Sequence, residues 1–175
     1  MIKEERLSID KHFRLIDDFC CGADSPLDIF LANDSFEYDT RRYGNTYIVL
    51  SDDDQSTIWG FYTLKANGIQ IEEKGEFVAV PVVEISRIAI SFDVQDSGIG
   101  KYVFYNNILP KVINVSEIVA VNAIVAFVDP GDDKAIGFYK SIGFERANQI
   151  VQKEIEDSFN ENCDLYLVSL NDLNN

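Results

Sequence analysis

Short runs of apolar, β-branched residues alternate along the chain with segments in which apolar positions recur at helical spacing. The runs predict strands at positions 46–50, 58–65, 69–72, 82–90, 118–125 and 164–170, with a short strand at Phe144. Helices are predicted from position 25 to about 38, from the turn near position 98 to about 115, and over 134–142. Positions 9–19 fit neither period, and 152–160 fit a short helix or a loop. Strands followed by strand–helix alternation predict a three-layer α+β fold, in which helices cover both faces of a mixed, mostly antiparallel sheet of six to seven strands.

Local turn signals set the limits of several elements. Ser25 is a good N-cap and Pro26 suits the first helical position, so a helix should begin there. Asn67-Gly68 is a hairpin signal that should separate the strands at 58–65 and 69–72. An acidic turn at Asp52-Asp53-Asp54 should join the strands at 46–50 and 58–65. No repeat or linker interrupts the chain, so we expect residues 1–175 to form one domain.

The junction between the strand at 82–90 and the next helix carries Gln95-Asp96-Ser97-Gly98-Ile99-Gly100, with Lys101 directly after it. A glycine-rich turn at a helix start directs main-chain N–H groups toward one point, where the helix dipole adds to them. The pattern therefore predicts a phosphate or pyrophosphate site, although a purely structural turn would use the same glycines. A Walker A loop is excluded because its Gly-Lys-Ser/Thr ending is missing, and Val103 replaces the third glycine of a dinucleotide fingerprint.

A second motif, about forty residues later, is Ala135-Ile136-Gly137-Phe138-Tyr139-Lys140-Ser141-Ile142-Gly143-Phe144. Together the two motifs resemble the GNAT superfamily of acyl-CoA-dependent N-acetyltransferases. In that superfamily a Gln/Arg-x-x-Gly-x-Gly/Ala loop holds the coenzyme A pyrophosphate, and an Ala-x-x-Phe-Tyr-x-x-x-Gly-Phe helix lies along the pantetheine arm. The resemblance implies a splayed GNAT sheet, whose two central strands part to admit coenzyme A.

Further segments resemble one branch of that superfamily, the acetyltransferase toxins of toxin–antitoxin pairs. They are Phe19-Cys20-Cys21-Gly22, Leu27-Asp28-Ile29-Phe30-Leu31, Thr46-Tyr47-Ile48-Val49, Gly60-Phe61-Tyr62-Thr63-Leu64 and Arg87-Ile88-Ala89-Ile90. Only about the first dozen residues and the stretch 148–162 fall outside the resemblance.

The resemblance implies that acetyl-CoA is the co-substrate and that main-chain groups hold most of it. The cofactor-binding positions it implies are Ile88, Ala89, Ile90, Gln95, Asp96, Ser97, Gly98, Ile99, Gly100, Lys101, Lys134 and Phe138. Asp96 and Ser97 depart from the residues usual at their positions in the superfamily. A carboxylate such as that of Asp96 is unfavourable beside a pyrophosphate unless it turns outward. Asp96 therefore bears on how tightly the cofactor is bound.

Tyr139 and Glu84 are the catalytic candidates. Tyr139 matches the tyrosine whose hydroxyl, in many relatives, lies near the coenzyme A sulfur and acts as general acid; the alternative is an aromatic ring that only packs against the sheet. Glu84 shares a strand face with Ser86 and Ile88. Relatives outside the toxin branch often place a catalytic Glu on this strand, so Glu84 is the candidate base. The alternatives are a solvent-facing or salt-bridged Glu84 and a water chain as the base.

Thirty acidic and fifteen basic residues give a net charge of −15. This charge opposes binding to nucleic acid or an anionic membrane, and it fits either simple solubility or a cationic acceptor. His12 has no ligand neighbours at metal-binding spacing, so no metal site is expected. Three cysteines, two of them adjacent, read as reduced thiols, and neither a signal peptide nor a long apolar run is visible, so we expect a cytoplasmic protein.

The expected function is acetyl-CoA-dependent transfer of an acetyl group to a primary amine of a small molecule, peptide or protein. One alternative is a toxin that acetylates aminoacyl-tRNA, with an antitoxin as partner, although the acidic charge argues against it. The other alternative is a non-catalytic module that binds acyl-CoA or a partner protein. A homodimer is compatible with each of these.

Overall fold

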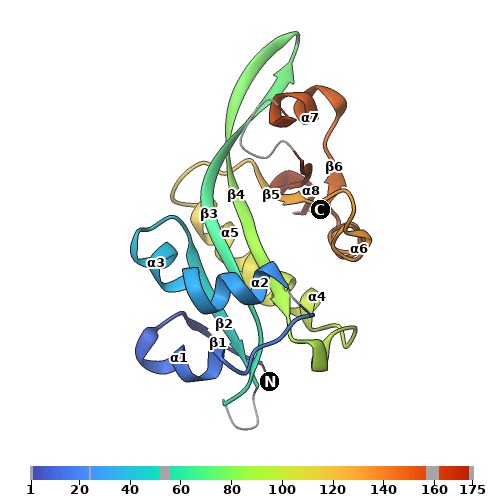
Figure 1. Ribbon diagram of the computed structural model, residues 1–175. Helices are drawn as coiled ribbons and strands as arrows, with labels where there is room; N and C mark the ends of the chain where they lie inside the picture. Colours follow the sequence, from blue (N-terminus) through green and yellow to red (C-terminus); the bar gives the residue numbers. More distant parts are fainter. Residues whose placement is uncertain (1, 24, 52–55, 157–161, 174–175) are drawn as a thin grey trace. The chain divides into compact units, whose positions relative to one another are not determined.

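The computed structural model of the chain describes all residues except 1, 24, 52–55, 157–161 and 174–175 (Figure 1). The predicted acidic turn at 52–54 therefore lies outside the described residues. By its internal contacts the chain divides into two compact units, one of Met1–Lys65 with Ile85–Val103 and the other of Ala66–Glu84 with Phe104–Asn175. The expectation of one domain over residues 1–175 remains a prediction.

Seven strands of the described residues form a mixed sheet in the order β1-β2-β3-β4-β5-β7-β6. They are β1 (Lys3–Arg6), β2 (Asn45–Leu50), β3 (Ile58–Glu73), β4 (Glu76–Ile90), β5 (Ala123–Val128), β6 (Glu145–Arg146) and β7 (Asp164–Ser169). β4 and β5 pair in parallel, whereas β1–β2, β2–β3, β5–β7 and β6–β7 pair antiparallel. The predicted α+β class and the mostly antiparallel sheet of six to seven strands are confirmed.

The helices of the described residues are α1 (Ile9–Ile16), α2 (Pro26–Ile29), α3 (Ser35–Thr40), α4 (Ile99–Val103), α5 (Leu109–Ser116), α6 (Asp133–Ser141), α7 (Gln149–Glu156) and α8 (Leu170–Leu173). Helices form in the three regions where they were predicted, whereas α1 and α8 were not predicted and α7 had been left open as a helix or a loop. Two wide π-helical turns, η1 (Phe30–Asp34) and η3 (Phe104–Ile108), continue α2 into α3 and α4 into α5. Ser25 caps α2 by accepting the Leu27 N–H, with Pro26 in the first turn, as predicted.

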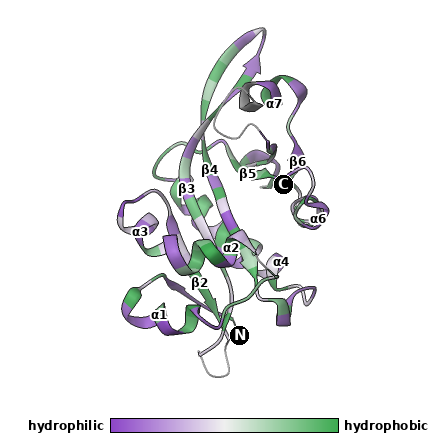
Figure 2. Cartoon of the chain, in the orientation of Figure 1, coloured by the Kyte–Doolittle hydropathy of each residue, from purple (hydrophilic) through white to green (hydrophobic). Residues whose placement is uncertain are grey.

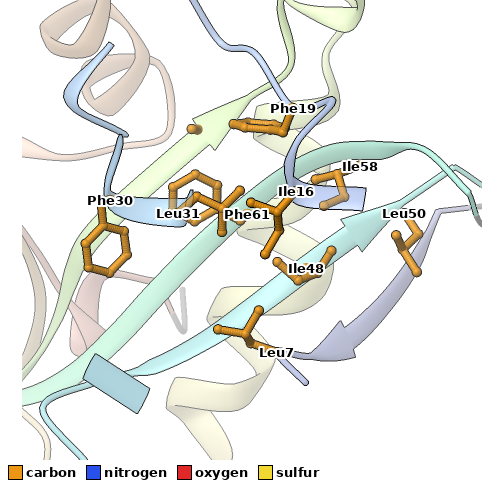
Figure 3. Close-up of a cluster of buried hydrophobic side chains, with 10 residues drawn as sticks. Leu7, Ile16, Phe19, Phe30, Leu31, Ile48, Leu50, Ile58 and Phe61 are labelled. Atoms are coloured by element: carbon orange, nitrogen blue, oxygen red, sulfur yellow. The ribbon is translucent and has the colours of Figure 1, made fainter. Parts of the chain in front are cut away.

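In the first unit, α1, α2 and η1 pack on the strands β1, β2 and β3 through one apolar cluster. Its buried members are Leu7, Ile16, Phe19, Phe30, Leu31, Ile48, Leu50, Ile58, Phe61 and Ala89 (Figure 3). α1 mixes hydrophilic and hydrophobic residues along its length (Figure 2). It buries His12 and Ile16 and exposes Ile9 and Phe13, so it forms from the segment that fitted neither period.

The predicted hairpin turn at Asn67-Gly68 is wrong. β3 runs without a break through both residues to Glu73, and the chain reverses at Lys74-Gly75 instead. Lys74 and Gly75 have φ of 54° and 85°, the left-handed pair that a tight hairpin needs. The side chain of Asn67 is used elsewhere, because it donates to the Glu84 carboxylate.

In the second unit, α7 covers the apolar side of the strands. The buried cluster consists of Ile69, Val82, Ala123, Val125, Val151 and Leu165. Gln152 on α7 brackets Leu165 of β7, donating to its carbonyl at 2.9 Å and accepting its N–H at 3.1 Å. α7 therefore settles the choice between helix and loop for the part of 152–160 that the structure describes.

Several strand limits differ from the predicted ones. β4 begins at Glu76 rather than at position 82, β7 ends at Ser169 because Leu170 begins α8, and β1 was not predicted. The strand expected at 118–125 begins only at Ala123, because Ile118 and Val119 both donate to the Val115 carbonyl and so close the end of α5. Ile118 is 84% exposed, so its apolar character misled the strand prediction. The strand expected at Phe144 lies at Glu145–Arg146, while Phe144 itself is buried. No helix among the described residues is long and apolar enough to cross a membrane.

Candidate functional site

The glycine-rich segment forms a loop between the end of β4 and a helix start, as predicted. After Ile90 the chain makes the 3₁₀ turn η2 (Phe92–Val94), and the Ser97 hydroxyl donates to the Val94 carbonyl at 2.5 Å. The Tyr102 N–H donates to the Gly98 carbonyl at 3.0 Å, so the helical hydrogen bonding begins at Gly98. The loop thus leads directly into a helix start, where main-chain N–H groups lie unpaired within the helix and can meet an anion.

Asp96 and Gly98 give this loop its sharp course. Both adopt left-handed backbone conformations, with φ of 60° and 88°. Gly98 is exposed, and an added Cβ would meet no atom within 4 Å. Asp96, Ser97 and Lys101 are also exposed, whereas Ile99 and Gly100 are half-buried. The loop therefore presents its main chain to solvent at Gly98, with one carboxylate and one ammonium close by in sequence.

The side chain of Gln95 braces the loop from inside. Its amide nitrogen donates to the main-chain oxygens of Cys21 at 2.7 Å and Ile90 at 2.9 Å. The neighbouring Phe92 N–H donates to the Cys20 carbonyl at 2.8 Å, and the Asp28 carboxylate accepts the Cys21 N–H at 3.0 Å. The sequence indicated Gln95 only as a cofactor-binding residue and the adjacent Cys20 and Cys21 only as reduced thiols. The structure ties all three to the loop's position.

The strand residues before the loop lie close to β3. Ala89 is buried, and Ile88 and Ile90 are half-buried. An added Cβ on Gly60 would lie 2.6 Å from the Ala89 oxygen, so only glycine allows this approach of the two strands. Arg87 is engaged locally: its guanidinium donates to the Ser86 carbonyl at 2.6 Å and lies 4.7 Å from the centre of the Phe30 ring.

Tyr139 lies on α6 in the second unit. Asp132 caps this helix by accepting the Ala135 N–H at 2.9 Å. The Tyr139 ring is 6% exposed and contacts the rings of Phe138 and Phe144, each with centroids 5.2 Å away. Burial raises the pKa of the Tyr139 hydroxyl well above its usual range, and the charges of Glu84 and Asp132 raise it further. The hydroxyl therefore stays protonated at neutral pH, and the raised pKa makes it a weaker acid than an exposed tyrosine.

Glu84 is 4% exposed, which excludes the solvent-facing alternative. It lies on β4 where this strand pairs in parallel with β5, opposite Val125. Its carboxylate accepts a hydrogen bond of 2.6 Å from the Asn67 side-chain nitrogen. A buried carboxylate held by a polar donor can act as a proton acceptor or as a fixed negative charge.

The predicted site residues fall into two groups. Ile88, Ala89, Ile90 and the segment Gln95–Lys101 belong to the first unit, where the Gln95 side chain joins strand and loop. Glu84, Lys134, Phe138 and Tyr139 belong to the second unit, with Lys134 exposed in the first turn of α6 and Phe138 half-buried. Among the described residues, no group of three or more His, Cys, Asp or Glu could hold a metal ion.

Sequence reasoning missed Asn67 and the brace from Gln95 to Cys21. Asn67 stands in an Asn-Gly pair, whose turn signal concealed its side-chain role. The contact between Gln95 and Cys21 has no local sequence signal, because 74 residues separate the two. The one available hint is that Phe19-Cys20-Cys21-Gly22 and Gln95 both belong to segments that resemble the same superfamily.

No family model matches the sequence, and no curated protein matches it. Solved structures of similar fold include that of the toxin AtaT. AtaT complexed with acetyl-methionyl-tRNAfMet is 20% identical over 99% of this chain and 98% of that chain, with a TM-score of 0.77.

Two further structures agree. A tyrosine-to-phenylalanine mutant of AtaT, bound to the C-terminus of the antitoxin AtaR and acetyl-CoA, is 23% identical over 98% of this chain and 94% of that chain, with a TM-score of 0.73. A tyrosine-to-phenylalanine mutant of KacT is 20% identical over 99% of this chain and 97% of that chain, with a TM-score of 0.78. The chain therefore has the fold of AtaT and KacT.

Proposed function

We propose that this chain is an acetyl-CoA-dependent N-acetyltransferase that passes an acetyl group directly from the thioester to a primary amine. The observation that carries the proposal is the exposed loop at Gly98, braced by Gln95 and leading into a helix start. Such a loop suits a pyrophosphate, and the fold is one in which AtaT has been solved with acetyl-CoA.

The first unit supplies the cofactor grip. Main-chain N–H groups around Gly98 hold the pyrophosphate, and Lys101 adds a positive charge directly after the loop. The strand residues Ile88, Ala89 and Ile90 line the acyl end, where the N–H of Ile90 or a neighbour polarises the thioester carbonyl. This grip uses few charged side chains, so it tolerates an acidic protein.

The second unit supplies the proton transfers. As the amine nitrogen bonds to the acetyl carbon and the carbon–sulfur bond breaks, Tyr139 donates its hydroxyl proton to the departing thiolate. Glu84 accepts the proton that the amine loses, and solvent exchange returns both groups to their starting states. The motif position of Tyr139 on α6 and the burial of the Glu84 carboxylate beside the Asn67 donor support this division of roles.

Two versions of this function differ in the amine that accepts the acetyl group. The complex of AtaT with acetyl-methionyl-tRNAfMet favours the α-amine of an aminoacyl-tRNA, with an antitoxin as partner. The net charge of −15 favours a small or peptide amine instead, because a tRNA footprint needs clustered Lys and Arg. We keep the general amine acceptor as the main proposal and the aminoacyl-tRNA as the second. We place the reaction in the cytoplasm, in keeping with the free thiols of Cys20, Cys21 and Cys163.

One assay tests the proposal and separates its versions. Acetyl-CoA is mixed with the protein and, in turn, with amino-acid amides, short peptides, polyamines and charged tRNA, and a thiol reagent reports released coenzyme A. Release that depends on an amine supports the transferase, and release with charged tRNA alone selects the toxin version. No release with any amine, together with an unchanged melting temperature in saturating acetyl-CoA, overturns the proposal.

A further inference from the structure

The half-buried Asn67 on β3 and the buried Glu84 on the neighbouring strand β4 are joined by a hydrogen bond. The Asn67 side-chain nitrogen lies 2.6 Å from Oε2 of Glu84, a short distance for an amide donor and typical of a charge-assisted hydrogen bond. Glu84 is 4% exposed, so this donor replaces water that the carboxylate has lost on folding.

The Asn67 amide is itself fixed in orientation. Its side-chain oxygen accepts the Gly68 N–H at 2.8 Å. Because this oxygen is the acceptor of a main-chain N–H, the amide cannot flip, and its nitrogen must point toward Glu84. The Asn67 side chain, fixed by the main chain of β3, thus sets the orientation of the buried Glu84 carboxylate.

Glu84 lies where its charge matters for the proposed reaction. It acts electrostatically on Tyr139, the proposed proton donor, together with Asp132 at the start of α6. These two carboxylates, one on β4 and one at the α6 N-terminus, are the charged groups that bear on the tyrosine. A change in the position or protonation of Glu84 therefore alters both proposed proton transfers.

We propose that Asn67 is a positioning residue that holds the Glu84 carboxylate, ionised and correctly oriented, for proton transfer from the amine. The catalytic part of this inference rests on the proposed acetyltransferase function. The positioning of the Glu84 carboxylate by the Asn67 hydrogen bond, called the hold below, does not depend on that function. An Asn-Gly pair inside a continuous strand is a poor choice for strand formation alone, and the two side-chain bonds of Asn67 account for it.

The hold is tested without any substrate by following the carboxyl carbons of the glutamates by NMR during a pH titration. The Glu84 signal is assigned by its absence in Glu84→Gln. Losing a donor to the charged form makes a carboxylate easier to protonate, so in Asn67→Ala the signal should change at higher pH than in the native protein. Asn67→Asp keeps the acceptor for the Gly68 N–H but removes the donor and adds a negative charge, so it should shift the titration further.

The catalytic consequence is tested with the amine that the acceptor assay identifies. Asn67→Ala should lower kcat/KM about ten-fold or more, and the acidic limb of its pH profile should move to higher pH. In a Glu84→Gln background the same substitution should have almost no further effect, because the group that Asn67 holds is then no longer a base. Gln70→Ala, an exposed change on the same strand, is the matched control and should leave both readouts unchanged.

The possible failures are distinguishable. An unchanged Glu84 titration in both Asn67 variants overturns the inference, whatever the activity. A shifted titration combined with full activity of Glu84→Gln supports the hold but refutes the base role within the proposed function. If Asn67→Ala and Glu84→Gln lower activity additively, Asn67 acts by another route and the inference is overturned.

Discussion

The side-chain nitrogen of Gln95 lies 2.7 Å from the main-chain oxygen of Cys21, across 74 residues of sequence. The same nitrogen also donates to the Ile90 oxygen at 2.9 Å, so one amide ties the N-terminal segment to the end of β4 and to the loop. This contact makes the loop conformation depend on residues that do not belong to it.

Replacing Gln95 by Ala should weaken acetyl-CoA binding about ten-fold, because the loop loses its brace while its main chain stays unchanged. The free energy of unfolding should fall by about 1–2 kcal/mol, as expected for two ordinary hydrogen bonds. Gln95→Glu should be worse than Ala, since a carboxylate would face two carbonyl oxygens. Isothermal titration with acetyl-CoA checks this, and native affinity in Gln95→Ala would show that the brace has no role in binding.

At Gly98, Ala and Glu should separate backbone strain from blockage of the site. The position has φ of 88° but open space around an added Cβ, so Gly98→Ala should cost about 1 kcal/mol of stability and keep measurable binding. Gly98→Glu adds a carboxylate where the pyrophosphate should lie and should abolish the rise in melting temperature caused by acetyl-CoA. Thermal melts with and without acetyl-CoA measure both the stability of each variant and its binding of acetyl-CoA. Equal binding by the two variants would show that the pyrophosphate does not bind at Gly98.

Asp96→Asn should tighten acetyl-CoA binding by roughly two- to five-fold at low salt, because it removes one exposed negative charge beside the pyrophosphate. Asn also tolerates the left-handed conformation that Asp96 adopts at φ of 60°, so the loop should keep its course. The gain should shrink as salt is added. Asp93→Asn, three residues earlier and also exposed, is a control for general charge effects. An equal gain from both changes would assign the effect to net charge alone.

Tyr139→Phe should lower kcat by about 100-fold or more and leave acetyl-CoA binding nearly intact, as expected for the loss of a general acid. The ring contacts with Phe138 and Phe144 involve only ring atoms, so the packing should persist. Phe138→Leu provides a comparison in which the packing changes but the hydroxyl remains. Full kcat in Tyr139→Phe would reduce this residue to a packing role, with solvent protonating the thiolate.

The stability of the protein should fall as the pH drops below about 6.5, through His12. Burial lowers the pKa of His12, and its Nδ1 accepts the Ser8 N–H at 3.0 Å at the start of α1. The Glu5 carboxylate, 3.7 Å from Nε2, acts in the opposite direction but less strongly. Since the folded pKa lies below the unfolded one, the unfolded state takes up a proton first, and acid favours unfolding in that window.

His12→Asn is the matched variant for this prediction, because its amide offers an acceptor near the position of Nδ1 and does not titrate. Urea unfolding at pH 7.5 and 5.5 should show a smaller loss of stability in His12→Asn than in the native protein. The same loss in both proteins would assign the acid sensitivity to other groups.

The sequence predicted most of the fold because its strands and helices have strong local signals. The loop at Gly98 and the helix with Tyr139 lie where the pattern placed them, and the strand predicted at 82–90 is the second part of β4, which begins at Glu76. Errors arose where tertiary contacts override a local signal. Asn67-Gly68 has the residues of a hairpin turn, yet Asn67 is needed within a strand, and Lys74-Gly75 turns the chain instead.

The site was predictable only in part. Main-chain binding at a glycine loop and a tyrosine on a helix follow from short motifs, so Gly98 and Tyr139 could be named from residues close in sequence. Contacts between distant residues have no such signal. The sequence left a solvent-facing Glu84 open, and the partner that holds its carboxylate lies 17 residues earlier, while the partner of Gln95 lies 74 residues earlier.

The wide turn η3 (Phe104–Ile108) has a consequence for how this chain can be aligned and edited. A π-helical turn amounts to one residue inserted into an α-helix, and it rotates everything that follows by about one position. Phe104 and Ile108 within the turn, and Val112 beyond it, are all buried in the described structure. A single-residue deletion here would leave an ordinary helix but turn Val112 away from the interior. Insertions and deletions at this point should therefore be far less tolerated than substitutions, and any alignment of related chains has to place a gap here whenever one of them lacks the extra residue.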